Sequence, residues 1–338
     1  MTTRTATSWW MWMGCALPLA LAAGGCTESD DPDVPGDPPT TGSSTHGAAA
    51  GGSGGTGSSS GGAGSANGGS SSGGSGSANG GASAGGSGAG GAPGLPWEGA
   101  LDPNAGPSSG RLIERQLGST TAPQAFYEYL PGGYPSAGAE WPLLMVLHGI
   151  GENGNGTSDL SNILATGIPP LIGNDEWPGD RPFVVLMPQH PGGGCPGASE
   201  VESMIAWAMA NYDIAPKWVF LTGLSCGAIG SWGYLAEHLD EQIAAFVPVA
   251  GDGKGAFASK GCDLAKVAIW AFHGDADGTV NVSGTNEPMD GLASCPKPPA
   301  LDTDKTIYPG VGHNSWDQTY DLSAGHDVYD WFLKHPKP

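Results

Sequence analysis

The short stretch GLSCG places a serine between two glycines, at Gly223, Ser225 and Gly227. An apolar run precedes it and a run with helical spacing follows, so the serine stands where a strand turns into a helix. A serine held at such a turn can act as a nucleophile if an imidazole takes its proton and a carboxylate orients that imidazole. The same spacing also arises by chance in a chain with 60 glycines, so the surrounding sequence must decide.

Continuous apolar runs such as WPLLMVLH and PFVVLMPQ predict strands that are covered on both faces. Runs with helical spacing separate several of them, which predicts a mostly parallel central sheet with helices on both faces. The first two strands, joined by a turn that contains proline, predict an N-terminal antiparallel hairpin. We expect strands at 111–117, 124–130, 141–148, 182–189, 217–222, 243–250, 266–273 and 305–309, and helices at 200–212, 228–239, 289–295 (its end) and 327–335.

In sheets of this kind, active sites lie at the carboxyl ends of the strands. Polar residues stand directly after several of the predicted strands. Ser225 comes first along the chain, Asp275 and Asp277 follow a later strand, and His313 follows the last. A nucleophile, an acid and a base are therefore expected to meet at one edge of the sheet.

Four segments, LHGIGEN, GLSCG, WAFHGDADGTV and YPGVGHNSW, together resemble the esterase branch of the α/β-hydrolases. The likeness covers roughly residues 109–336 and points to bacterial exported proteins described as predicted esterases or peptidases, akin to dienelactone hydrolases, feruloyl esterases and polyhydroxybutyrate depolymerases. It implies an α/β-hydrolase fold and a serine carboxylic-ester hydrolase that works through an acyl-enzyme, without metal or cofactor. A serine peptidase of the same fold and a catalytically inactive surface-binding module are the alternatives.

The resemblance implies that Ser225 is the nucleophile, His313 the base and Asp277 the acid, since Asp277 stands at the acid position of the HGxxD pattern. Asp275 stays open as the rival acid, because both carboxylates would lie on the same side of an extended segment. We expect His148 and His273 to hold loops by hydrogen bonds.

Backbone amides that face the developing oxyanion are the other requirement of acyl transfer. The amide after the nucleophile belongs to Cys226, and the resemblance places the second donor at Ile150, directly after His-Gly. Gly149, Gly151 and Trp316 would line the substrate pocket. The chain between the three catalytic positions is too short for a large lid domain, so we expect an open site for a small-molecule or polymeric ester. An acyl or feruloyl group on a polysaccharide, or a polyester, would suit it.

Strand direction indicates how four cysteines pair. Cys195 follows a strand and Cys226 stands at the turn, so both lie on the active-site side, whereas Cys262 precedes a strand and Cys295 follows the return helix. Disulfides Cys195–Cys226 and Cys262–Cys295 avoid a bridge across the sheet, and the first would fix the residue that donates one oxyanion amide. Two buried free thiols are the alternative.

The N-terminal part differs in composition. An apolar run from Trp9 to Ala23 predicts a secretory signal over residues 1–26. LAAGGC resembles the lipobox of bacterial lipoproteins, which implies lipidation of Cys26 and a membrane anchor, although Ala23 stands where that family usually has Leu, Val or Ile. An ordinary signal peptide that releases a soluble protein is the alternative.

Residues 27–96 are rich in Gly, Ser and Ala and are expected to form a disordered linker, which leaves residues 97–338 as the catalytic domain. We therefore expect an exported protein, held in the bacterial cell envelope as a lipoprotein or secreted. The net charge of −21 repels phosphate backbones and argues against nucleic-acid binding.

Overall fold

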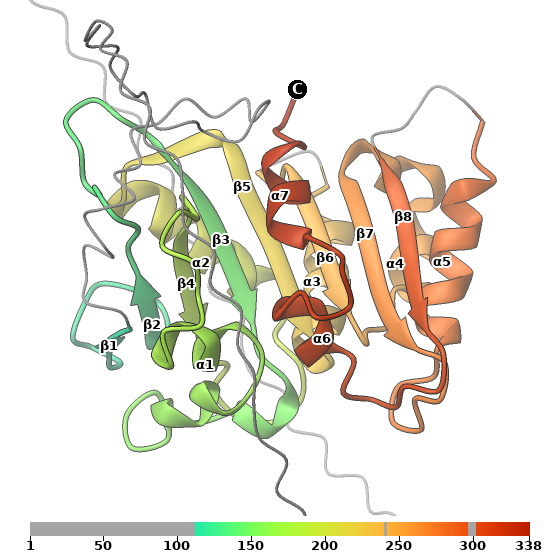
Figure 1. Ribbon diagram of the computed structural model, residues 1–338, viewed down its shortest axis with the longest axis horizontal. Coiled ribbons are helices and arrows are strands. Elements are labelled where there is room, and N and C mark those ends of the chain that lie inside the picture. Colours follow the sequence, from blue (N-terminus) through green and yellow to red (C-terminus); the bar gives the residue numbers. More distant parts are fainter. Residues whose placement is uncertain (1–111, 240–241, 297–301) are drawn as a thin grey trace, which may run out of the picture. The chain divides into compact units, whose positions relative to one another are not determined.

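The structure is a computed structural model that describes residues 112–239, 242–296 and 302–338. The predicted signal segment 1–26 with Cys26, the linker 27–96 and the expected domain start at residue 97 lie outside the described residues. Within them, strands form one sheet in the order β1-β2-β4-β3-β5-β6-β7-β8 (Figure 1). The strands are β1 (Ile113–Arg115), β2 (Phe126–Tyr129), β3 (Trp141–Leu147), β4 (Val184–Pro188), β5 (Ile214–Leu224), β6 (Ala245–Val249), β7 (Ala268–Gly274) and β8 (Thr303–Tyr308).

The sheet is mostly parallel, as predicted. β1 and β2 form an antiparallel hairpin, β2 runs antiparallel to β4, and the remaining neighbours are parallel. β5 begins three residues earlier than predicted, since Ile214 pairs with Trp141 at the start of β3. The carboxyl ends of β3 and of β5 to β8 therefore meet at one edge, where the candidate residues follow them.

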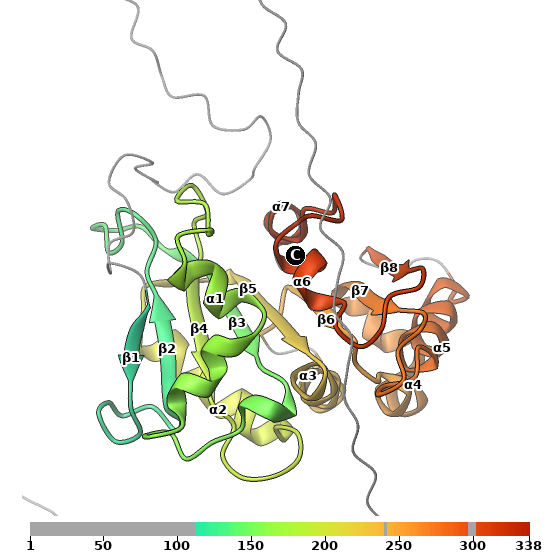
Figure 2. The same cartoon turned by 60° about the horizontal axis from the view of Figure 1, so that its bottom comes forward.

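Helices cover both faces of the sheet, and alternate side chains of each strand enter two separate cores. Leu143 and Met145 of β3 belong to a core that includes residues of α2, α3, α4 and α5, whereas Leu144 and Val146 belong to a core that includes residues of η2, α1, α6 and α7. Figure 2 shows α3 and α4 on one side of the sheet and α6 and α7 on the other. The helices are η1 (Ile150–Glu152), η2 (Leu160–Ala165), α1 (Ile168–Gly173), α2 (Ala198–Asn211), α3 (Cys226–Glu237), α4 (Lys254–Lys260), η3 (Gly261–Lys266), α5 (Ser283–Ala293), α6 (Trp316–Tyr320) and α7 (Val328–Leu333).

Helix α5 begins six residues before the segment that the sequence indicated, although Pro288 lies inside it. Proline has no N–H to donate to the carbonyl four residues earlier, which here belongs to Gly284. Gly253 donates its N–H to that carbonyl oxygen instead, at 2.9 Å. The Gly253 N–H thus satisfies the carbonyl that Pro288 cannot, so the helix continues through the proline.

The connections that follow β5, β6, β7 and β8 contain short helices and no inserted lid domain, as far as the described residues extend. None of the helices in the described part is long and apolar enough to cross a membrane. The carboxyl edge of the sheet is therefore bordered by loops and helix ends.

Candidate active site

Ser225 stands at the turn from β5 into α3, with φ 50° and ψ −116°. A positive φ is strained for a residue with a side chain, so neighbouring structure must hold it. The N–H of Ser225 donates to the carbonyl oxygen of Val249 on β6 at 2.9 Å. A Cβ on Gly227 would lie 2.5 Å from the carbonyl oxygen of His148, and one on Gly223 would lie 2.6 Å from the carbonyl carbon of Gly227. Close backbone approach thus requires glycine at both flanking positions.

Three side chains from three connections form one hydrogen-bonded chain. His313 Nε2 lies 2.9 Å from Ser225 Oγ, and His313 Nδ1 lies 2.7 Å from Asp277 Oδ2. Ser225 and Asp277 are each only 8% exposed. Asp275, the rival acid, accepts a hydrogen bond from Gly310 N–H at 2.6 Å, so its carboxylate holds the loop after β8.

The Asp277 carboxylate is held by four donors. Oδ1 accepts from the N–H groups of Thr279 and Val280 at 2.8 and 2.9 Å, and Oδ2 lies 3.1 Å from His273 Nε2 in addition to His313. Burial acts to raise the pKa of Asp277, but the hydrogen bonds from His313, Thr279 and Val280 outweigh it and keep the pKa below its ordinary value. The carboxylate is therefore ionised at neutral pH and can stabilise a protonated His313.

His273 is fully buried and contacts the Asp277 carboxylate directly, a contact that the sequence did not predict. Its Nε2 faces the Asp277 carboxylate and the carbonyl oxygen of Val280 at 2.9 Å, both of which only accept, so Nε2 carries a proton. Its Nδ1 lies 2.8 Å from Thr285 Oγ1. The four-residue spacing from His273 to Asp277 across the end of β7 was the available signal.

The two predicted oxyanion donors begin two helices. Cys226 is the first residue of α3 and Ile150 the first of η1, so neither amide takes part in the hydrogen bonds within its helix. A Cβ on Gly149 would lie 3.7 Å from Ser225 Cβ, which places the Ile150 segment directly beside the serine. The side chain of Ile150 is 58% exposed, and a Cβ on Gly151 would meet open space. This segment borders an accessible surface.

Trp316 packs edge-on against His313, with ring centroids 5.1 Å apart and an interplanar angle of 89°. Trp316 is mostly buried. The indole therefore supports the imidazole from the side, and a substrate could reach only the small part of the ring that stays exposed.

His148 is buried and neutral. Its Nε2 accepts from the backbone N–H of His190 at 2.9 Å, and Nδ1 lies 2.6 Å from the carbonyl oxygen of Gly149. The pKa of His148 is lowered to about 4, mainly by burial and to a smaller extent by the nearby His190, while the hydrogen bond with the Gly149 carbonyl acts to raise it. His148 thus holds a loop, as expected. Within the described ranges, no group of three or more His, Cys, Asp or Glu side chains is placed to hold a metal ion.

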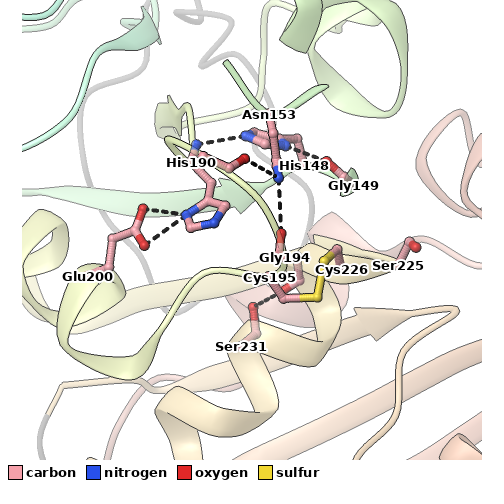
Figure 3. The surroundings of a disulfide bond; sticks show 12 residues. His148, Gly149, Asn153, His190, Gly194, Cys195, Glu200, Ser225, Cys226 and Ser231 are labelled. Atoms are coloured by element: carbon pink, nitrogen blue, oxygen red, sulfur yellow. Dashed lines mark hydrogen bonds and ion pairs between the residues drawn. A yellow bond between two sulfur atoms is a disulfide. The ribbon is translucent and has the colours of Figure 1, made fainter. Parts of the chain in front are cut away.

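The structure contains disulfides Cys195–Cys226 and Cys262–Cys295, the pairing that strand direction indicated. Figure 3 shows the first beside Ser225, at the start of α3. The second joins η3 to the end of α5, since Cys262 lies in η3 and Cys295 two residues after α5.

No protein-family model and no curated protein matches the chain. Solved structures do, among them a thermostable esterase with a TM-score of 0.52 and 21% identity, over 67% of this chain and 62% of that one. The chain has the α/β-hydrolase fold. Two other structures are similar: the feruloyl esterase module from Clostridium thermocellum complexed with sinapinate (TM-score 0.46, 17% identity, 71% of this chain and 93% of that one) and acetyl xylan esterase from Aspergillus awamori (TM-score 0.44, 18% identity, 62% and 98%).

The α/β-hydrolase fold explains which predicted residues meet. Its sheet brings together the side chains of Ser225, Asp277 and His313 at one edge, with Trp316 beside them and the Gly149 segment against the serine. The match spans less than two thirds of the thermostable esterase, so the similarity gives the fold and leaves the reaction to be argued from the site.

Proposed function

We propose that this chain is a serine ester hydrolase in which Ser225 attacks the ester carbonyl and forms an acyl-enzyme. The observation that carries the proposal is the continuous hydrogen-bonded chain from Ser225 Oγ through both nitrogens of His313 to the Asp277 carboxylate. A nucleophile, a base and an orienting acid in this order are what acyl transfer needs.

In the first half of the reaction, His313 Nε2 takes the proton of Ser225 Oγ as the oxygen bonds to the carbonyl carbon. The carbonyl oxygen becomes an oxyanion that the amides of Cys226 and Ile150 would stabilise, each by about 3 kcal/mol. His313 then gives its proton to the leaving alcohol, and the ester becomes an acyl group on Ser225.

In the second half, water replaces the alcohol. His313 takes a proton from the water, whose oxygen attacks the acyl carbon, and the acid product leaves as Ser225 regains its proton. The low pKa of Asp277 suits both halves, because an ionised carboxylate stabilises His313 whenever the imidazole is protonated.

For the substrate, we propose an extracellular ester presented on a polymer, either an acyl or feruloyl ester of a polysaccharide or a polyester. The exposed side chain of Ile150 beside the serine and the lack of an inserted lid among the described residues suit a bulky substrate. Export, and a membrane anchor through Cys26, complete the proposal and rest on the sequence of residues 1–26 alone.

The experiment that tests the reaction compares hydrolysis of p-nitrophenyl acetate by the wild type and by Ser225→Ala. We expect the variant to lose about 10⁴-fold or more in kcat while staying folded. Equal rates in both proteins would refute the role of Ser225. A panel of acetylated and feruloylated polysaccharides, polyesters and casein then separates ester from peptide substrates.

A further inference from the structure

The loop of residues 190–196, here called the bridge loop, lies beside both segments that would supply the oxyanion donors (Figure 3). Cys195, near its end, forms a disulfide with Cys226, with the two Cα atoms 4.9 Å apart. Pro196 packs on the next turn of α3, where a Cβ on Gly230 would lie 2.5 Å from the proline Cγ. The bridge loop is thus fixed to the start of α3 and to the residue that carries the first donor amide.

The other side of the bridge loop is attached to the segment that carries Ile150. Asn153, the residue after η1, donates from Nδ2 to the carbonyl oxygens of Gly192 and Gly194, both at 3.0 Å. One side-chain amide therefore holds two carbonyls of the bridge loop, three residues away from the second donor.

Two hydrogen bonds donated by backbone N–H groups support the same attachment. Gly154 N–H donates to the carbonyl oxygen of His190 at 3.1 Å, and His190 N–H donates to Nε2 of His148 at 2.9 Å. His148 in turn precedes Gly149, where an added Cβ would lie 3.7 Å from Ser225 Cβ. The first residue of the bridge loop is therefore fixed on the Ile150 side independently of Asn153.

The middle of the bridge loop has little packing of its own. Residues 191–194 are exposed, and Gly192 and Gly194 have φ of 86° and 88°, values that favour glycine. A glycine-rich exposed loop keeps one shape only if its attachments define it. Here those attachments are the hydrogen bonds from Asn153 and the disulfide to Cys226.

We propose that the bridge loop sets the spacing between the two oxyanion donors, and that Asn153 is a positioning residue that acts through the Cys195–Cys226 disulfide. The inference rests on the proposed function, since it assumes that the amides of Cys226 and Ile150 face one oxyanion. A displacement of about 1 Å in such a site can cost up to about 100-fold in rate. A partial release of one attachment should therefore cost about tenfold in kcat and leave KM nearly unchanged.

The test is a double-mutant cycle in the full chain with Asn153→Ala, Cys195→Ala and both changes together. We expect each single variant to lose about tenfold in kcat, and the double variant to lose little more than either one, because both changes break the same link. Asn153→Asp, which keeps the size but cannot donate to two carbonyls, should behave like Asn153→Ala. Affinity for phenylboronic acid, which forms a tetrahedral adduct with serine, should fall by the same factor as kcat.

The second disulfide provides the matched control. It spans 33 residues against 31 for the first, so its removal should cost similar stability through the unfolded chain. Cys262→Ala with Cys295→Ala should therefore lower the melting temperature as Cys195→Ala does, but leave kcat unchanged. If Cys195→Ala does not fold, the variant with Cys262→Ala and Cys295→Ala is used in its place. That folded protein keeps the Cys195–Cys226 disulfide, which brief treatment with a reductant then breaks before kcat is measured.

Unchanged kcat and boronic-acid affinity in both Asn153 variants would overturn the proposal, and so would a double variant whose loss is the product of the two single losses. Ser225→Ala separates this failure from that of the proposed function. If the wild type neither hydrolyses esters nor binds the boronic acid, or if Ser225→Ala does both as well as the wild type, the serine mechanism itself fails.

Discussion

Acidification provides a direct test of the buried neutral state of His148. In the fold its pKa is about 4, against 6.5 in the unfolded chain, because burial disfavours the charged ring more strongly than the Gly149 carbonyl favours it, and the nearby His190 disfavours it too. Between these two values the unfolded state binds more protons, so stability is fully present above pH 6.5 and is lost as the pH falls towards 4. A difference of this size corresponds to about 3 kcal/mol.

The assay is urea unfolding at pH 7, 6, 5 and 4, for the wild type and for His148→Gln. The glutamine oxygen can still accept from the His190 N–H but does not titrate in this range. Carboxylates and other histidines contribute equally to both proteins, so the stability difference between them isolates His148. We expect the wild type to lose about 3 kcal/mol more than the variant between pH 7 and 4. If the unfolding free energies of the wild type and His148→Gln fall by the same amount between pH 7 and 4, His148 is not held neutral and this prediction is refuted.

Three further predictions concern the site. Asp277→Asn should lower kcat by about 10⁴-fold with little change in melting temperature, because the amide favours the wrong tautomer of His313. A loss of kcat below tenfold in steady-state assays would contradict this prediction. His273→Leu should lower kcat by about tenfold or more while His273→Gln keeps most of it, since glutamine can still donate to Asp277; equal losses in both variants would refute a donor role. Gly227→Ala should abolish activity and lower the stability measured by calorimetry. Gly233→Ala on the same helix is the control, because an added Cβ there meets nothing, and it should leave stability unchanged or raise it by up to about 1 kcal/mol.

Much of the fold follows from local pattern. β3 is a continuous apolar run in the sequence and is buried along its whole length, so its prediction needed no tertiary information. The early start of β5 and the proline inside α5 could not be predicted in this way. They depend on Ile214 pairing with Trp141 and on Gly253 donating to Gly284, contacts between residues far apart in the chain.

The candidate site, too, was predictable from local sequence in part, and the rest depends on contacts between distant residues. The meeting of Ser225, Asp277 and His313 could be predicted because each follows a strand and the esterase resemblance singles out each residue. Sequence alone could not tell which carboxylate lies against His313, and the structure places Asp277 there while Asp275 accepts from Gly310. Asn153 gave no signal, because its partners are loop carbonyls about 40 residues away, which sequence spacing cannot indicate.

The central claim is that Ser225 is the nucleophile, and covalent labelling tests it most directly. The purified protein is treated with a p-nitrophenyl phosphonate ester, and peptide mass spectrometry then locates the adduct as esterase activity is followed. We predict one phosphonyl group per chain, on the peptide that contains Ser225, with activity lost in proportion to labelling and no adduct in Ser225→Ala. Complete labelling of Ser225 with activity retained, or inactivation with the adduct on another residue, would contradict the account.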